Sequence, residues 1–282
     1  MTPELTVIVP TRDRPEALAR CLAALGAQHG RPWETLVVDD GSHDRARIAE
    51  LVAAEPRARL LRRDGDGPAA ARNAAVREAR GTYVCFTDDD CEPAPDWAES
   101  LAGRLEAGAT IVGGTTLNGR PESSYVTAAE RIRRHLEEFT RARHPGRGFF
   151  ATNNLACRRE LALELRFDEA YGAGGEDRDW CARAASAGHE LVFEPVAVVR
   201  HLPALDLRGF WRQQVRYGRG AYRFHRSRPR GEREHRQPAS FYLLLVRGGF
   251  RDGFRPGLLV VFSQVATAVG LLREAWSDRG GA

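Results

Sequence analysis

The sequence predicts an α/β fold: a doubly wound, mostly parallel sheet followed by a helical C-terminal extension. Over residues 1–115, short apolar and β-branched runs alternate with segments of helical periodicity. Each expected strand is a nearly continuous apolar run, which is typical of a parallel sheet covered by helices on both faces. With 43% hydrophobic and 28% charged residues among 282, the composition is that of a globular protein and excludes a disordered or collagen-like chain.

The elements follow a regular order along the first half of the chain. Strands are expected at 6–9, 34–40, 59–62, 83–87 and 110–113. Helices are expected between them at 15–28, 44–54, 68–80 and 95–105. This alternation predicts a single doubly wound unit.

The alternation ends after Gly114. The later elements are a long Arg-rich helix at 123–143, a strand at 149–157, a helix at 177–187, a strand at 191–199 and a basic helix at 207–224. A polar segment at 226–238 and an apolar tail follow. We therefore expect one domain over 1–225, with halves 1–115 and 116–225, and a helical extension over 226–282.

The chain has five cysteines, an odd number, and no Cys-x-x-Cys pair. This pattern argues against a zinc site and against a disulfide framework. The first residues carry neither a basic nor an apolar leader segment, so nothing marks the chain for secretion. We expect a cytoplasmic protein in which the cysteines are small buried hydrophobic residues.

All 42 basic residues are arginines, and 11 of them lie between Arg200 and Arg236 with only three acidic residues, which gives this segment a charge of +8. One interpretation is a GC-rich genome that favours arginine codons. The other is a surface that faces phosphate or anionic lipid, because arginine binds phosphate bidentately and keeps its charge. We expect no nucleic-acid partner, since no stacking platform of aromatic residues accompanies the arginines.

The longest apolar stretch is 257–272, in the C-terminal tail. It has 16 residues, which is shorter than the ~20 that span a bilayer, so we expect it not to cross a membrane. Beside the basic segment, it could rest peripherally on an anionic leaflet, on the inner face of the cell membrane. The alternative is packing against the rest of the chain or against a second subunit in a homodimer.

Polar and acidic residues follow three of the expected strands, at 10–13, 39–42 and 88–90. The carboxyl ends of parallel strands share one edge of a sheet, and ligands bind at that edge. Three consecutive carboxylates after an apolar strand are costly to bury without a cation, and their oxygens suit Mg²⁺ or Mn²⁺. The alternative is a solvated acidic turn that caps the next helix. The first turn has no GxGxxG, which argues against a dinucleotide-dependent dehydrogenase.

Six motifs in order over residues 5–220 resemble those of the family 2 glycosyltransferases. They are TVIVPTRDRP (6–15), VVDDGS (37–42), GPAAARNAA (67–75), FTDDDCEP (86–93), GGEDRDWCARA (174–184) and QQVRYGRG (213–220). The resemblance implies the GT-A fold and an inverting transfer of a sugar from a nucleoside-diphosphate sugar, with UDP- or dTDP-sugars favoured. The acceptor hydroxyl would belong to a sugar, a lipid-linked molecule or a small molecule, in envelope polysaccharide, glycolipid or secondary-metabolite synthesis.

The resemblance also implies a donor site with a divalent metal, Mn²⁺ or Mg²⁺. The nucleoside-diphosphate sugar would contact Pro10, Thr11, Arg12, Asp40, Arg72, Asp88 and Asp89. Asp88 and Asp90 match the outer positions of the family's DxD motif and would hold the metal together with His201, which follows the strand at 191–199. The alternative for His201 is an ordinary surface histidine.

In the same family a Glu-Asp pair supplies the general base, and the resemblance assigns that role to Asp177, beside Glu176. The alternative is a helix cap with a salt bridge to Arg178 or Arg183. The acceptor or the diphosphate would contact Asn153, Asn154, Gln213 and Arg216. The alternatives are that the two asparagine amides only satisfy a turn, and that Gln213 and Arg216 belong to an Arg-rich helix face in water. QQVRYGRG has Tyr217 where the family usually has tryptophan.

Two other functions compete with this interpretation. A nucleotidyltransferase would need a Gly-rich basic loop after the first strand to hold a triphosphate, and Arg12-Asp-Arg14 is a poor version of such a loop. A non-catalytic glycan-binding protein of the same fold would have no need of Asp88, Asp90 and Asp177 together.

Overall fold

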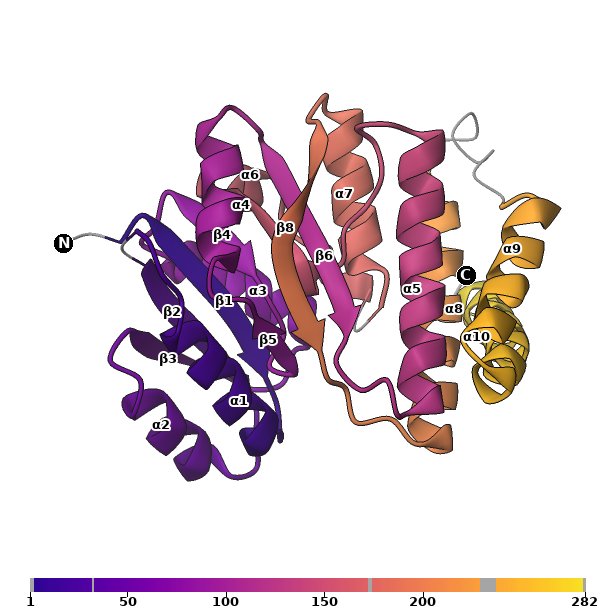
Figure 1. Ribbon diagram of the computed structural model, residues 1–282, viewed down its shortest axis with the longest axis horizontal. Helices are drawn as coiled ribbons and strands as arrows, with labels where there is room; N and C mark the ends of the chain where they lie inside the picture. The colour runs from indigo at the N-terminus through magenta and orange to yellow at the C-terminus, as the bar shows by residue number, and fades with distance from the viewer. Residues whose placement is uncertain (1–2, 32, 172–173, 229–236, 281–282) are drawn as a thin grey trace.

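The computed structural model describes residues 3–31, 33–171, 174–228 and 237–280. Its centre is an eight-stranded sheet in the order β3-β2-β1-β4-β7-β6-β8-β5 (Figure 1). The strands are β1 (Leu5–Thr11), β2 (Trp33–Asp40), β3 (Ala58–Arg63), β4 (Tyr83–Phe86), β5 (Cys91–Pro93), β6 (Ile111–Asn118), β7 (Leu155–Arg158) and β8 (Leu191–His201). Strands β1 to β4 are parallel, β7 is antiparallel to β4 and β6, β8 is parallel to β6, and β5 is antiparallel to β8.

Helices cover both faces of the sheet, as predicted, and a helical extension follows it. They are α1 (Pro15–Gly26), α2 (Arg45–Ala53), α3 (Pro68–Glu78), α4 (Trp97–Glu106), α5 (Ser124–Arg143), α6 (Arg159–Leu165), α7 (Glu176–Ser186), α8 (Leu207–Ser227), α9 (Ala239–Arg251) and α10 (Phe254–Gly280). Two short 3₁₀ turns are also present, at Thr152–Asn154 and Glu169–Tyr171. The expected boundary at residue 225 falls inside α8, and part of the expected polar segment, 229–236, lies outside the described residues.

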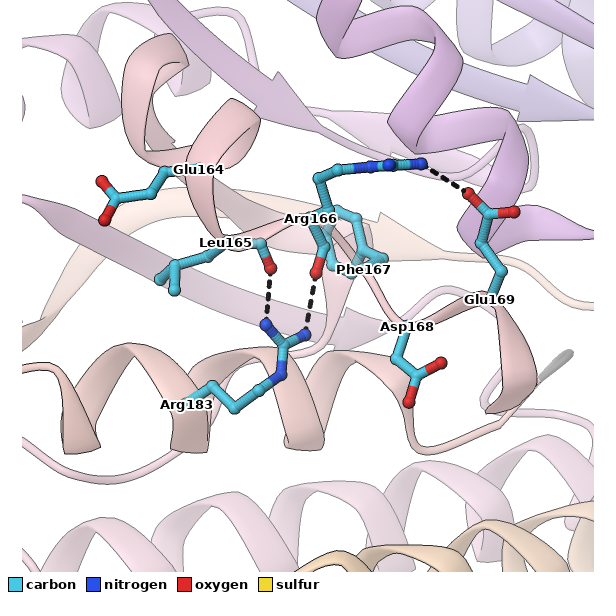
Figure 2. Close-up of a pocket in the computed structure, with 7 residues that line it drawn as sticks. All are labelled: Glu164, Leu165, Arg166, Phe167, Asp168, Glu169 and Arg183. Carbon is cyan, nitrogen blue, oxygen red and sulfur yellow. Dashed lines mark hydrogen bonds and ion pairs between the residues drawn. The ribbon is translucent and has the colours of Figure 1, made fainter.

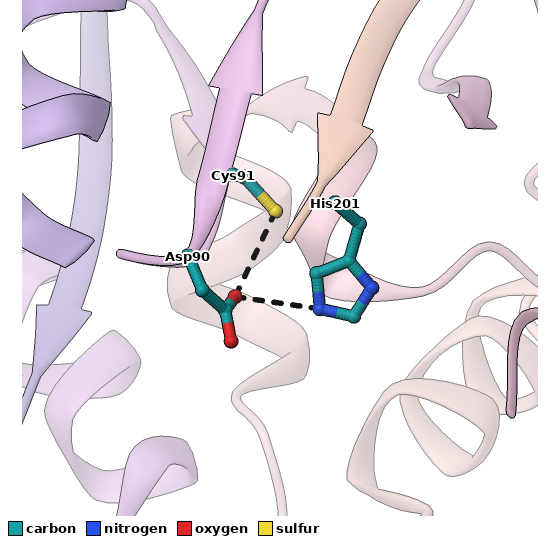
Figure 3. Close-up of side chains that lie close together, drawn as sticks. All are labelled: Asp90, Cys91 and His201. Atoms are coloured by element: carbon teal, nitrogen blue, oxygen red, sulfur yellow. Dashed lines mark hydrogen bonds and ion pairs between the residues drawn. The ribbon is translucent and has the colours of Figure 1, made fainter. Parts of the chain in front are cut away.

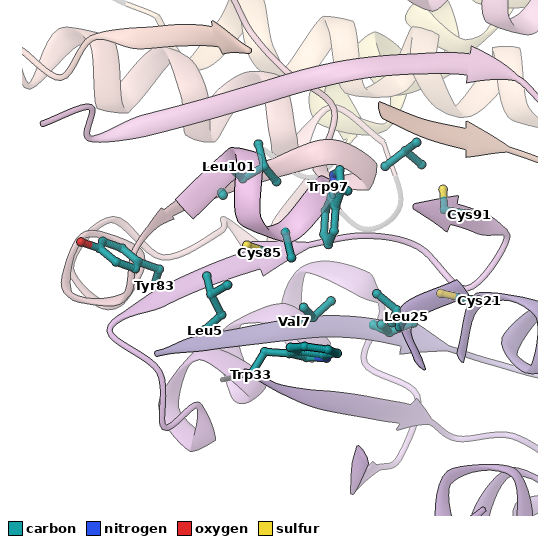
Figure 4. Packing of buried hydrophobic residues seen from close by; sticks show 14 of the residues in the cluster. Leu5, Val7, Cys21, Leu25, Trp33, Tyr83, Cys85, Cys91, Trp97 and Leu101 are labelled. Carbon is teal, nitrogen blue, oxygen red and sulfur yellow. The ribbon is translucent and has the colours of Figure 1, made fainter. Parts of the chain in front are cut away.

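The two faces of the sheet bury separate cores. Helices α1, α2 and α4 cover one face, where Trp97 packs among side chains of β1, β4 and α1 (Figure 4). Helices α3, α6 and α7 cover the other face, where Trp180 stacks on Phe167. A third cluster joins α5, α8, α9 and α10 beyond the β6–β8 side of the sheet (Figure 1). The five cysteines are buried and free, as expected.

Two strand predictions were wrong in detail. Of the strand expected at 149–157, only Leu155–Arg158 pairs with neighbours, because Phe149 and Phe150 turn into the core instead. The Phe150 ring lies over Gly113, where a Cβ atom would come within 2.0 Å of it. The sequence also gave no sign of β5, a three-residue strand that contains a proline and is tolerated because it lies at the sheet edge.

The length argument about the apolar tail was also wrong. Helix α10 extends well beyond 257–272, and its segment Phe254–Arg279 is long and apolar enough to cross a membrane. This rests on length and composition only, which buried core helices can share. In the structure α10 packs along α8, and the carboxylate of Glu274 pairs with Arg219 and Arg223.

Close packing of α8 on α10 depends on small residues. A Cβ atom at Gly218 would lie 2.1 Å from the carbonyl oxygen of Thr267, and one at Gly270 would lie 2.1 Å from that of Val215. The two backbones therefore touch at these positions.

We expect Gly218→Ala to lower the free energy of unfolding by about 1–3 kcal/mol, because α8 and α10 would have to move apart. Thermal unfolding of the purified chain measures this. Gly103→Ala on α4 is the control: a Cβ atom there meets nothing within 4 Å, and alanine favours a helix over glycine by up to about 1 kcal/mol. An unchanged melting temperature for Gly218→Ala would contradict the packing described here.

Candidate functional site

The polar ends of β1, β2 and β4 meet at one edge of the sheet, which confirms the expected convergence. The three strands are adjacent and parallel. The Thr11 hydroxyl donates to the Asp89 carboxylate at 2.7 Å, and the Asp13 amide donates to the Ser42 hydroxyl at 3.0 Å. Three loops far apart in the sequence thus form one polar surface.

We call Asp88, Asp89 and Asp90 the DDD segment. Their three carboxylates have different partners. Asp89 is fully buried and pairs with Arg14 at 2.6 Å. Burial raises the pKa of Asp89 to about 7, although the charge of Arg14 opposes the rise. Asp90 pairs with the same Arg14 at 2.9 Å, through a different nitrogen of the guanidinium. Asp88 is partly exposed and accepts a hydrogen bond from Arg72 at 2.8 Å. A solvated turn is therefore not what the segment forms.

Asp90 and His201 face one another at the ends of β5 and β8 (Figure 3). The His201 Nε2 atom lies 3.3 Å from Asp90, and its Nδ1 atom lies 2.5 Å from the carboxylate of Glu130 on α5. Burial lowers the pKa of His201, but the two carboxylates outweigh burial and raise it. His201 is thus not an ordinary surface histidine.

The ligand atoms of Asp90, Cys91 and His201 lie within 4.8 Å of one another, an arrangement that could hold a metal ion. Burial raises the pKa of the Cys91 thiol well above its usual value, and Mg²⁺ and Mn²⁺ prefer oxygen ligands. Asp90 and His201 are therefore the better ligands, and the carboxylate of Glu130 orients the imidazole as carboxylates do in known metal sites. The donor set fits a divalent cation.

Arg72 connects the two acidic motifs of the sequence. It is buried on α3, where it donates to Asp88 at 2.8 Å and to Glu176 at 3.1 Å. Glu176 is 104 residues away in the sequence and begins α7. A single guanidinium thus holds the start of α7 beside the DDD segment.

Asp177 lies in the first turn of α7, after Gly175, which has a φ of +94° that favours glycine. Burial raises the pKa of Asp177 to about 7, and the negative charge of Glu176 adds to the rise. The alternative interpretation as a salt-bridged cap is not observed. Arg183 pairs with Asp179 instead, and no ion pair of Asp177 is present among the described residues.

Asp40, one of the expected nucleotide contacts, holds a loop in place. Both carboxylate oxygens of Asp40 accept backbone N–H groups, from Asp66 at 3.1 Å and from Gly67 at 2.9 Å. This fixes the loop that leads into α3 and Arg72. Pro10 lies at the end of β1, and Arg12 is exposed next to it.

The residues expected to contact the acceptor differ in burial: Asn153 and Asn154 are buried, whereas Arg216 is exposed. The amide of Asn154 is used within the fold: it accepts a hydrogen bond from Trp97 and donates to the carbonyls of Thr115 and Ala197 in the interior. Asn153 is also buried and accepts from Thr116 at 3.3 Å.

Gln213 and Arg216 lie on α8, which passes beside the loop before α7. A Cβ atom at Gly174 would be 3.4 Å from both the Arg216 carbonyl oxygen and the Tyr217 ring. The Arg216 side chain is exposed. The structure therefore brings Arg216 and Tyr217 near the start of α7, where Asp177 lies.

Sequence reasoning missed two residues at this site. Arg14 lies in the TRDRP motif and contacts both Asp89 and Asp90, so its position three residues after β1 could have identified it. Glu130 had no local signal, because its contact with His201 joins α5 to β8 across 71 residues.

A surface hollow lies elsewhere, between α6 and α7 (Figure 2). It is lined by Glu164, Leu165, Arg166, Phe167, Asp168, Glu169 and Arg183. Arg183 closes one side by donating to the carbonyl oxygens of Leu165 at 2.5 Å and Arg166 at 2.8 Å. The hollow shares no residue with the acidic site.

Comparison with solved structures shows the fold. A mannosyltransferase from Pyrobaculum calidifontis, solved in complex with GDP-Man and Mn²⁺, superposes with a TM-score of 0.67 at 20% identity over 98% of this chain and 88% of that one. Residues 1–349 of TarS from S. aureus superpose with a TM-score of 0.54 at 16% identity, over 99% of this chain and 92% of that one. The fold is therefore that of the GT-A glycosyltransferases, with a C-terminal helical extension.

Comparison with curated sequences gives relatives of moderate identity. The amylovoran biosynthesis glycosyltransferase AmsB of Erwinia amylovora is 30% identical over 68% of each chain. A pre-mycofactocin glycosyltransferase of Mycobacterium tuberculosis is 28% identical over 77% of this chain, but the match covers 47% of that protein. The chain thus spans about half the length of that relative. The profile of glycosyl transferase family 2 matches residues 6–166, more than half of the sequence, and the chain belongs to that family.

Proposed function

We propose that this protein transfers a sugar from a nucleoside-diphosphate sugar to an acceptor hydroxyl in a single displacement that inverts the anomeric carbon. The observation that carries the proposal is the buried Arg72, which holds the DDD segment and the start of α7 together. A donor-binding acidic site and a carboxylate of raised pKa thereby lie on neighbouring elements. This is the arrangement that a sugar transfer with a separate base requires.

In this proposal Asp90 and His201 would hold a divalent cation, Mn²⁺ or Mg²⁺, with Asp88 at the same edge. Such a cation would supply positive charge for the diphosphate of the leaving nucleotide. Arg14 contributes positive charge beside Asp89 and Asp90. The nucleoside lies over the ends of β1 and β2, where Pro10, Thr11, Arg12 and Asp40 form the wall.

Asp177 acts as the base that removes the proton of the acceptor hydroxyl. A base works best when its pKa lies near the working pH, and burial brings that of Asp177 to about 7. Glu176 has a different task, because its carboxylate is bound by Arg72. It positions the first turn of α7. Gln213 and Arg216 on α8 are the nearest proposed contacts for the acceptor or diphosphate.

The favoured donors are UDP- and dTDP-sugars, and a GDP-sugar enters the test because the mannosyltransferase that shares the fold was solved with GDP-Man. One relative is named for amylovoran biosynthesis and another is named a pre-mycofactocin glycosyltransferase, which supports a role in polysaccharide or cofactor synthesis. We further propose that residues 1–225 form the catalytic unit, and that the protein works on the cytoplasmic side of the cell membrane.

The proposal predicts metal-dependent stabilisation by nucleotides. In a thermal-shift panel of UDP, dTDP and GDP, one nucleotide should raise the melting temperature in the presence of Mn²⁺ and not with a chelator. A ligand at 100 times its dissociation constant stabilises the native state by about 2.7 kcal/mol, which is readily detected. A nucleoside triphosphate is added to the panel as a further ligand, and stabilisation by it with none by the three diphosphates would favour a nucleotidyltransferase instead.

Glu130→Gln is expected to weaken Mn²⁺ binding by about 10- to 100-fold, because the carboxylate that orients His201 is lost. Isothermal titration with Mn²⁺ alone measures this without any activity assay. Glu138→Gln is the matched control, since Glu138 is an exposed glutamate on the same helix. Equal Mn²⁺ affinity in the Glu130 variant and the control would remove Glu130 from the site.

A further inference from the structure

One side of α10 is apolar and exposed along nearly its whole length. The exposed side chains recur at helical spacing, as Phe254, Leu258, Val261, Val265, Leu272 and Trp276. Phe254 and Leu272 are each 71% exposed and Trp276 is 81% exposed. The stripe from Phe254 to Trp276 is about 33 Å long at 1.5 Å per residue. An apolar strip of this size on a surface indicates a binding face.

Helix α9 lies beside α10 and adds to the same hairpin (Figure 1). Its exposed apolar side chains include Leu243, at 70% exposure, and Phe250, at 42%. We call the exposed apolar residues of α9 and α10 the hairpin face.

The acidic and basic residues of this hairpin differ in their surroundings. Its acidic residues are bound by other helices: Asp252 pairs with Arg131 on α5, Glu274 with Arg219 and Arg223 on α8, and Asp278 with Arg226 on α8. Its arginines are exposed, and none has an acidic partner among the described residues. They are Arg247, Arg251, Arg255, Arg273 and Arg279. The charged side chains of the described hairpin that have no partner of opposite charge are therefore all positive.

The arginines flank the apolar stripe. Arg255 and Arg273 are separated by a whole number of helical turns, so both lie on one side of the stripe, one near each end. Apolar side chains between basic residues are what a helix lying in a membrane interface needs, because arginine binds anionic headgroups while the apolar stripe enters the acyl region.

We propose that the hairpin face rests on an anionic lipid leaflet. The opposite side of α10 cannot also face lipid, since Glu274 and the backbone at Thr267 are held against α8. The helix therefore lies along the leaflet and does not cross it. A second copy of the chain fits this face less well: a symmetric contact would bring the arginines of two hairpins together, while the acidic residues of each hairpin are already paired with arginines of other helices.

The placement has a consequence that rests on the proposed function. Helix α8 separates the hairpin from the loop before α7: Gly218 touches α10, and Gly220 touches Gly174. The leaflet would lie about one helix layer beyond α8, at the 8–10 Å spacing typical of packed helices. An acceptor carried on a lipid would reach Asp177 from this side.

Co-sedimentation of the 282-residue chain with vesicles tests the proposal. The vesicles are phosphatidylcholine with about one third phosphatidylglycerol, compared with phosphatidylcholine alone. We expect binding to the anionic vesicles at about 0.05 M NaCl, weakened at least about tenfold at about 0.5 M. Leu258→Gln/Val265→Gln/Leu272→Gln should weaken binding by about tenfold or more, and Arg251→Gln/Arg255→Gln/Arg273→Gln should remove most of the preference for anionic lipid.

The control Leu117→Gln/Val196→Gln replaces exposed apolar side chains on β6 and β8 and should bind as the unchanged chain does. Circular dichroism shows that each variant is folded. The proposal is overturned if the chain does not bind anionic vesicles at low salt, or if Leu258→Gln/Val265→Gln/Leu272→Gln binds normally. A dimer that this variant abolishes, without vesicle binding, would assign the face to a second copy. The assay needs neither donor nor metal, so its failure leaves the proposed transfer reaction standing.

Discussion

Asp177→Asn is expected to lower the transfer rate by about 10²- to 10⁴-fold while leaving donor affinity unchanged. The substitution is nearly isosteric and removes only the ability to accept a proton. In the proposed reaction the donor binds at the DDD segment. The link from that segment to α7 runs through Arg72 and Glu176, which the change does not touch. Single-turnover rates and donor titration, measured separately, distinguish the two effects.

The pH dependence gives a second readout of the same residue. Because burial and Glu176 raise the pKa of Asp177 to about 7, its basic form is lost as the pH falls below that value. The transfer rate should therefore rise with pH and level off above about 7. Asp177→Asn should abolish that rise, and Asp168→Asn, at an exposed aspartate in the loop before α7, should keep it.

Transfer within a few-fold of the unchanged enzyme in Asp177→Asn would place the base elsewhere. The nearest other carboxylates are Glu176 and Asp179, and both are bound by arginines, at 3.1 Å from Arg72 and 2.7 Å from Arg183. A carboxylate in an ion pair is a weaker base, which is why we favour Asp177.

Asp90→Asn is expected to weaken Mn²⁺ binding by at least about 100-fold and to abolish metal-dependent nucleotide binding. A ligand that binds the metal directly should matter at least as much as the supporting residues, whose loss costs 10- to 100-fold. The asparagine keeps the shape of the side chain beside Arg14 and His201. Calorimetric titration with Mn²⁺, and then with nucleotide, measures both effects.

Asp96→Asn is the control for this experiment, because Asp96 is a highly exposed aspartate shortly after the same segment. Its metal affinity should match that of the unchanged chain. A folded Asp90 variant with full Mn²⁺ affinity would show that the metal site does not include Asp90.

The sequence predicted the parts of the fold that follow from local pattern. Apolar runs ending in polar residues identified β1, β2 and β4, and their parallel order made the polar ends meet at Thr11 and Asp89. Strand β5 escaped because three residues with a proline carry no periodicity. Helix α10 was underestimated because the apolar run was counted without its amphipathic ends.

The site was predictable where a motif carries the residue. Asp88, Asp90, Asp177 and His201 were identified as candidates from short patterns, and the structure brings Asp90 and His201 to 3.3 Å. Partners contributed from distant elements were not predictable. The link from Arg72 to Glu176 and the support of His201 by Glu130 depend on tertiary packing, which no local pattern records. The sequence around Asn154 allowed either an acceptor contact or a turn, and only the structure shows that its amide forms hydrogen bonds in the interior.

The most direct test of the central claim is donor turnover. The chain is incubated with a panel of UDP-, dTDP- and GDP-sugars, with Mn²⁺, with Mg²⁺ or with a chelator, and release of the nucleoside diphosphate is followed. We predict slow hydrolysis of a subset of the donors, dependent on the metal and absent in Asp90→Asn. Turnover that is the same with the chelator as with the metal would contradict a metal-dependent sugar transferase. So would a result in which no donor releases its nucleoside diphosphate while a nucleoside triphosphate and a sugar phosphate yield pyrophosphate.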